Sequence, residues 1–134
     1  MISAIPPEIE RAQYISLSTF RRSGAVVATA VRFATDDGRI YLYSALDAGK
    51  MKRVRATSRV TAVPCDVKGK VAPGAVPVAG SAVELPSERG PFVHGLLNRK
   101  YGWKKHAMEF FMAIPEKLRI RTASADGFVE ITLD

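Results

Sequence analysis

The chain has 134 residues, of which 47% are hydrophobic, and its 20 lysines and arginines outnumber 13 acidic residues to give a net charge of +7. This length is typical of a single domain with a buried core, here residues 1–134, and no apolar run approaches the ~20 residues of a membrane-spanning helix. The excess of positive charge favours anionic partners, such as nucleic acids, acidic lipids, or phosphorylated or polycarboxylate small molecules.

The first part of the chain predicts a short helix followed by strands. A helix is expected over 7–13, because proline suits a first turn and the glutamates suit the positive end of a helix dipole. Apolar side chains then alternate with period two, as they do on half-buried strands. Three strands are expected to form a meander, with tight turns at Gly24 and at Asp36-Asp37-Gly38: 14–20, 25–35 and 39–45.

A glycine and a basic helix follow the third strand. Asp47 is expected to cap this helix, which ends near Arg55 to Thr57 and has only Met51 and Val54 for packing. Its first turns carry the cations Lys50, Lys52, Arg53 and Arg55. Unpaired N–H groups and a partial positive charge make a helix N-terminus a natural phosphate seat. The alternative is a solvated basic helix that covers a sheet edge.

Strands also dominate the second part of the chain. Pro64 is expected at a bulge or a sheet edge, and Gly80 indicates a bend or the close approach of another backbone. Gly102 is expected to divide a helical region. The expected elements are strands over 59–66 and 76–85 with a turn-rich loop between them, a helical region over 87–112, and a final hairpin of 117–124 and 127–133.

About seven short strands with tight turns favour a barrel or a closed sandwich. So few strands barely enclose a core, which points to dimerisation over one sheet face. The small residues expected on such a face are Ala28, Ala30, Ala79 and Ala82.

The sequence offers little for catalysis by side chains. His94 and His106 are far from Cys65 in the chain and lack the spacing of a metal site, and Cys65 has no recognisable neighbouring base. We therefore predict no catalytic side chain and no metal site, and expect that any reaction uses the reactive atom of a bound cofactor. Thr29 and Ser44 are candidate contacts for it, although strand hydroxyls commonly bond to neighbouring backbone.

Nucleic-acid binding is an alternative function. Phe33, Tyr41 and Tyr43 could stack on bases beside lysines and arginines. The chain has no aromatic signature of a known RNA-binding module, and the same tyrosines are ordinary strand formers. We expect no nucleic-acid partner.

The run from Tyr14 to Asp66, with its order of strands, turns and basic helix, resembles the actinobacterial coenzyme F420-dependent (deazaflavin) members of the pyridoxamine-phosphate-oxidase-like superfamily, the B group of flavin/deazaflavin oxidoreductases. The loop 68–70, the strand 76–85 and the segment 99–102 are similar to a short oxidoreductase subfamily of that group. The resemblance implies a mainly β fold, the FMN-binding split β-barrel with two or three short helices. It also implies a homodimer with the cofactor in a groove between subunits.

The function implied by this resemblance is hydride transfer from reduced coenzyme F420 to an unsaturated small-molecule acceptor of the enone, quinone or tetrapyrrole type. The implied cofactor-binding residues are Thr29, Val31 and Ser44 for the ring, Lys50, Lys52 and Arg55 for the phosphate, and Lys68 and Lys70, with Arg99 or Lys100, for the acidic tail. FMN or haem as the cofactor, and a non-catalytic carrier, remain open alternatives. The single cysteine and the absence of a signal-peptide pattern lead us to expect a cytoplasmic protein.

Overall fold

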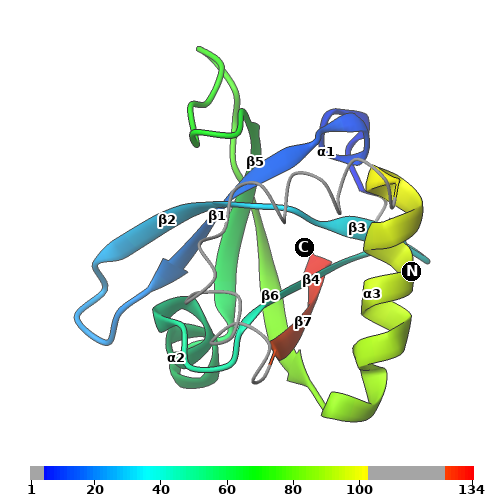
Figure 1. Cartoon of the computed structure of the whole chain (residues 1–134). Helices are drawn as coiled ribbons and strands as arrows, with labels where there is room; N and C mark the ends of the chain where they lie inside the picture. The colour runs from blue at the N-terminus through cyan, green and yellow to red at the C-terminus, as the bar shows by residue number, and fades with distance from the viewer. Residues whose placement is uncertain (1–4, 103–125) are drawn as a thin grey trace.

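One antiparallel sheet of seven strands dominates the computed structural model, which describes residues 5–102 and 126–134 (Figure 1). The strands are β1 (Tyr14–Phe20), β2 (Val26–Val31), β3 (Ala34–Asp36), β4 (Arg39–Ala45), β5 (Arg59–Cys65), β6 (Val78–Leu85) and β7 (Asp126–Leu133). The helices are α1 (Pro7–Arg11), α2 (Gly49–Ala56) and α3 (Gly90–Tyr101), with a 3-10 turn η1 (Ser87–Arg89) before α3. No helix of the described part of the chain is long and apolar enough to cross a membrane.

The sheet order, β2-β1-β5-β6-β7-β4-β3, places β2 and β3 at opposite edges. Only Arg32 and Phe33 separate these two strands in the chain. Because successive Cα atoms are about 3.8 Å apart, the two edges must approach each other, so the sheet curls into a half-closed barrel.

The predicted single strand over 25–35 is therefore wrong, and so is the predicted meander. The chain leaves one sheet edge after Val31 and joins the other edge at Ala34, and β2 and β4 are not neighbours. Tyr101 of α3 bonds to the backbone at this break: its hydroxyl accepts from the N–H of Phe33 at 3.0 Å and lies 2.7 Å from the carbonyl oxygen of Gln13. Burial raises the pKa of Tyr101 to about 12, which keeps the hydroxyl protonated.

Alternation along β4 separates two apolar clusters, as the sequence predicts. Ile40 and Leu42 point into the barrel, whereas Tyr41 packs on the outer face under α3. The inner cluster also contains Met51 and Val54, the two residues of the basic helix that were expected to pack. The outer cluster joins α3 to the sheet through Val93, Leu96, Leu97 and Phe128.

Most of the turn predictions are confirmed. Gly24 and Gly38 have φ values of 91° and 75°, which suit glycine in hairpin turns. The pairing of β5 with β6 ends at Ala62, whereas the pairing of β5 with β1 continues past Pro64. Pro64 therefore lies on a part of β5 that β6 does not flank, as expected for proline at a sheet edge. Gly102, with φ of 74°, ends α3.

The last part of the chain is described only in part. The predicted helical residues 103–112, His106 and the predicted strand 117–124 lie outside the described residues. The final strand, β7, is present and pairs with β4 on one side and β6 on the other. Both of its sides are therefore occupied by strands that are distant in sequence, which the predicted hairpin did not anticipate.

Candidate anion site at the start of helix α2

Helix α2 presents its cations on two different flanks. Met51 and Val54 point into the core, so the residues on either side of that stripe point in opposite directions. Arg53 reaches β1 on one flank, and Arg55 reaches β6 on the other. Lys52 is exposed to solvent. The basic helix is therefore not uniformly solvated, and each cation has its own environment.

The N-terminus of α2 has no side-chain cap. Its N-cap residue is Ala48, and no acidic residue occupies the first turn. The predicted capping role of Asp47 is wrong, because the helix starts one residue later than a cap at Asp47 requires. The positive end of the helix dipole is thus not neutralised by a carboxylate of its own first turn.

Two cations gather at this helix start. A Cβ atom on Gly49 would lie 2.8 Å from Nη1 of Arg53, so the guanidinium folds back over the first helical residue. Burial, and secondly the charge of Arg53, lower the pKa of Lys50. In the part of the chain that the structure describes, neither Lys50 nor Arg53 forms an ion pair. An anion bound between the two would relieve both the repulsion and the lost hydration.

The barrel interior holds Arg53 in this position. Nε of Arg53 donates to Oγ1 of Thr19 at 2.6 Å, and this hydroxyl, from a residue only 1% exposed, donates to the carbonyl oxygen of Val27 at 3.4 Å. Because Nε makes this bond, the guanidinium still has Nη donors for a ligand. Arg53 is absent from the phosphate contacts that the family resemblance implies, which are Lys50, Lys52 and Arg55. Its spacing of three from Lys50, which places the two on neighbouring parts of a helix surface, is the signal that could have found it.

Strand β2 carries a buried polar group, the hydroxyl of Thr29. This hydroxyl has no hydrogen-bond partner among the residues that the structure describes. Thr29 lies on the same face of β2 as Val27, two residues and about 7 Å along the strand. An unpaired buried hydroxyl costs about 1–3 kcal/mol, so a ligand atom that bonds to it would bind with that advantage.

Arg55 is engaged elsewhere. Its Nε and Nη2 donate to the two carboxylate oxygens of Glu84 at 2.7 and 2.9 Å, and Nη2 also donates to the carbonyl oxygen of Leu46 at 3.1 Å. This hydrogen bonding raises the pKa of Arg55 and lowers the pKa of Glu84. The structure therefore brings Arg53, rather than Arg55, next to Lys50.

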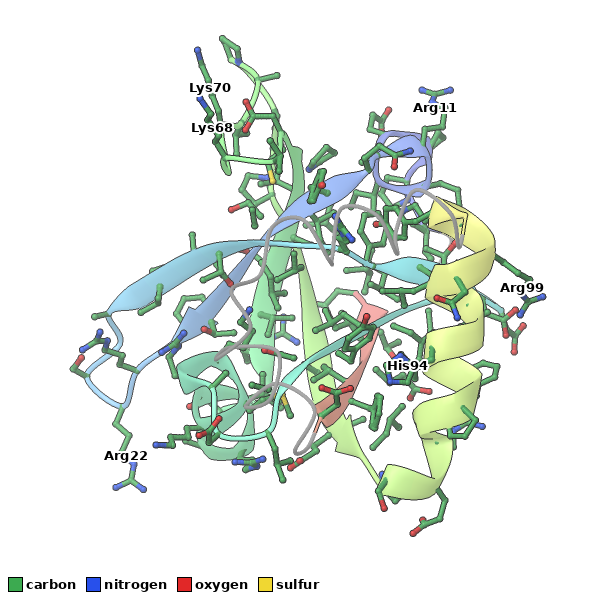
Figure 2. The ribbon with its side chains drawn as sticks, in the orientation of Figure 1. Arg11, Arg22, Lys68, Lys70, His94 and Arg99 are labelled. Carbon is green, nitrogen blue, oxygen red and sulfur yellow. The ribbon has the colours of Figure 1, made fainter. Side chains whose placement is uncertain are left out.

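The remaining predicted contacts do not gather around Lys50. Val31 packs in the inner cluster, and Ser44 is half-buried near the end of β4. Lys68 and Lys70 project from the loop at the top of Figure 2, away from α2. The seven-residue strand β5 lies between that loop and α2 in the chain and spans about 20 Å. Arg99 lies on the exposed surface of α3 (Figure 2). The acidic-tail contacts thus remain predictions. Lys68 and Lys70 lie beyond one end of β5, and the helix with Lys50 lies beyond the other end.

The aromatic residues of the nucleic-acid alternative are largely hidden. Phe33 is 0% exposed and Tyr41 is 2% exposed, so neither ring can stack on a base. Cys65 is half-buried, and burial followed by the charge of Asp66 raises the pKa of its thiol, which opposes thiolate chemistry. Among the described residues, no group of three histidine, cysteine or acidic side chains could hold a metal ion.

Lys100, a further candidate for the acidic tail, points inward. Its Nζ is buried 3.4 Å from the centre of the Phe33 ring and has no hydrogen-bond partner within the described parts of the chain. Burial lowers the pKa of Lys100 to about 8, and the charge of Glu10 opposes this only in part. The cation–π contact compensates for some of the lost hydration.

Replacing Lys100 by methionine is expected to raise the free energy of unfolding at pH 7 by about 1–2 kcal/mol, allowing for the partial solvent exposure of the side chain. The unfolded chain binds more protons than the folded chain between pH 8 and pH 10.5, because the folded pKa is the lower one. The wild type should therefore gain stability across that window, and the variant should not. Urea unfolding at pH 7 and pH 10.5 measures this, with Lys68→Met as an exposed control. A stability difference that is the same at both pH values would contradict the prediction.

Comparison with known proteins relates the chain to a fold. No protein-family model matches it, and no curated protein matches it. Among solved structures, an F420 reductase superposes with a TM-score of 0.64 at 18% identity, over 100% of this chain and 96% of the other. The haem storage protein of Vibrio cholerae superposes with a TM-score of 0.66 at 11% identity, over 98% of this chain and 92% of the other. An FAD-binding protein of Mesorhizobium loti superposes with a TM-score of 0.60 at 15% identity, over 95% of this chain and 83% of the other. These likenesses confirm the predicted split β-barrel fold.

Proposed function

We propose that the protein is an oxidoreductase that binds a phosphate-bearing, flavin-type cofactor at the start of α2. The proposed cofactor is coenzyme F420, with FMN as the alternative, and the proposed reaction is hydride transfer to an unsaturated organic acceptor of the enone, quinone or tetrapyrrole type. The observation that carries the proposal is the pair of Lys50 and Arg53 at a helix start without a carboxylate. The fold shared with an F420 reductase and an FAD-binding protein supports it.

The residues of this site fit such a group. The ammonium of Lys50, the guanidinium of Arg53 and the first-turn N–H groups of α2 would hold the phosphate, with Lys52 available from the exposed side. The unpaired hydroxyl of Thr29 would bond to a polar atom of the cofactor. A bound reduced deazaflavin supplies the hydride. The chain contributes binding, orientation and the exclusion of water.

A homodimer with the cofactor in the groove between subunits is part of the proposal. Cross-strand pairing aligns Ala28 with Ser18, Ser18 with Thr61, and Thr61 with Ala79, so one row of small residues crosses four strands. Two such faces can approach closely. Ala82 does not belong to this row, because it lies in the inner cluster at 1% exposure. Light scattering coupled to gel filtration measures the oligomeric state, and a monomer at micromolar concentration would contradict this part of the proposal.

The experiment that tests the function is a fluorescence titration of the purified protein with coenzyme F420 and, in parallel, with FMN at physiological salt. Tight binding of F420 supports the proposal and is followed by an acceptor screen with the reduced coenzyme. Preference for FMN would assign the protein to flavin chemistry, and tight binding without turnover of any acceptor would make it a carrier. Binding of neither at micromolar concentration would overturn the proposal.

A further inference from the structure

A cavity of about 670 Å³ lies on the other flank of α2, beside Arg55. It forms where β4, β6, η1 and β7 meet at their ends. Its walls are mostly apolar, and two carboxylates interrupt them. The apolar walls include Leu46, Leu85, Pro86 and Phe128, and the two acids are Glu84 and Asp126.

The two carboxylates differ in what they can still bind. Both oxygens of Glu84 accept hydrogen bonds from Arg55, which neutralises that group. Asp126 contacts Nε2 of His94 at 3.2 Å through Oδ2. Its other oxygen, Oδ1, has no hydrogen bond to any described residue. Asp126 is therefore the acceptor that a ligand in the cavity would meet.

His94 contacts the Asp126 carboxylate but does not itself line the cavity. It reaches from α3 towards the strands, as Figure 2 shows, and its ring lies between two aromatic rings. The ring centres of Tyr43 and His94 are 4.3 Å apart, and those of His94 and Phe128 are 5.4 Å apart in an edge-to-face contact. Burial, and then the charge of Asp126, raise the pKa of Tyr43. The imidazole is thus fixed by side chains from β4 and β7.

The cavity and the α2 seat have opposite electrostatic characters. The seat presents cations for an anion, whereas the cavity presents mostly apolar walls and a carboxylate oxygen that has no hydrogen bond to the described residues. An apolar slot with a few fixed polar groups is typical of small-molecule sites. A carboxylate accepts hydrogen bonds strongly and repels anions.

We propose that this cavity binds a small, flat, mostly apolar molecule that carries an O–H or N–H donor. Oδ1 of Asp126 accepts the hydrogen bond from the ligand, His94 acts as the positioning residue for the carboxylate, and Leu46, Leu85 and Phe128 contact the ring. This site is separate from the cofactor seat, so the inference goes beyond the proposed function and does not depend on it.

The test uses two probes of nearly the same shape, 2-naphthol and 2-methoxynaphthalene, of which only the first has a donor. Calorimetric titration of the full chain without cofactor should give an affinity for 2-naphthol at least about tenfold higher, the effect of one hydrogen bond to a charged group. Asp126→Asn should lower 2-naphthol binding towards that of the methoxy compound, because an amide oxygen is a weaker acceptor than a carboxylate oxygen. Asp37→Asn, the same change in an exposed turn, should leave it unaltered.

His94→Gln should lower the preference for 2-naphthol over 2-methoxynaphthalene without changing the affinity for the latter. A merely structural role for His94 would lower both affinities together. Equal binding of the two probes to the wild type, no binding of either, or an unchanged preference in Asp126→Asn would overturn the proposal. Thermal unfolding of each variant reports on its folding. Titration of the same variants with F420 and FMN separates a failure of this proposal from a failure of the cofactor proposal, because Asp126→Asn should leave cofactor affinity unchanged.

Discussion

Replacing Lys50 and Arg53 together by alanine is expected to lower the affinity for a phosphate-bearing cofactor by about a hundredfold or more. Each cation can form a charge-assisted hydrogen bond to the phosphate, worth about 1.5–3 kcal/mol, and each 1.4 kcal/mol is about a factor of ten in affinity. The two side chains share one partly buried site at the helix start, so salt screens them less than it screens surface charges. Fluorescence titration of wild type and variant with F420 and FMN measures the loss.

Arg55 provides a matched control on the same helix. Arg55→Ala removes one positive charge, as Arg53→Ala does, but takes it from the flank where Glu84 already binds the guanidinium. We expect Arg55→Ala to change the affinity by less than about threefold, the range of a screened charge on the protein surface. An equal loss in Arg55→Ala and Arg53→Ala would place the phosphate on the β6 side of α2 instead. Arg53→Lys keeps the charge and loses the Nε bond to Thr19, so it separates charge from positioning.

Gly80→Ala is expected to lower the free energy of unfolding by about 2–3 kcal/mol, the upper range for overpacking. A Cβ atom at this position would lie 2.7 Å from the carbonyl oxygen of Thr132 and 3.1 Å from Cα of Leu133. Both are backbone atoms of β7, which cannot move away without opening the β6–β7 ladder. Urea unfolding followed by circular dichroism measures the loss.

Gly95→Ala is the opposite case. Gly95 lies inside α3, and a Cβ atom there would have no neighbour within 4 Å. The same substitution should therefore raise the free energy of unfolding by about 0.5–1 kcal/mol, because alanine has the higher helix propensity. If Gly80→Ala were as stable as the wild type, the close approach of β6 to β7 would be wrong.

How far the site could be predicted differs from residue to residue. Lys50 follows from its place in the first turn of a basic helix, and the structure places it there beside a second cation. Arg53 could have been predicted from helical periodicity, which puts it three residues from Lys50. The bond between Arg55 and Glu84 could not have been predicted, because Glu84 lies on strand β6, 29 residues further along the chain. The pairing of His94 with Asp126 depends in the same way on α3 packing against β7.

Local features of the fold follow from the order of the residues alone: the faces of β4, the glycine turns at Gly24 and Gly38, and the packing of Met51 and Val54. Each depends on residues that are two to four positions apart, for which the periodicity of a strand or helix decides the outcome. Three other features depend on long-range packing: which strands pair, where the run after Val26 breaks, and which cations of α2 have no ion pair with a described residue. Alternation specifies the face of a strand but not its neighbour, and an ion pair forms wherever the fold brings its two charges together.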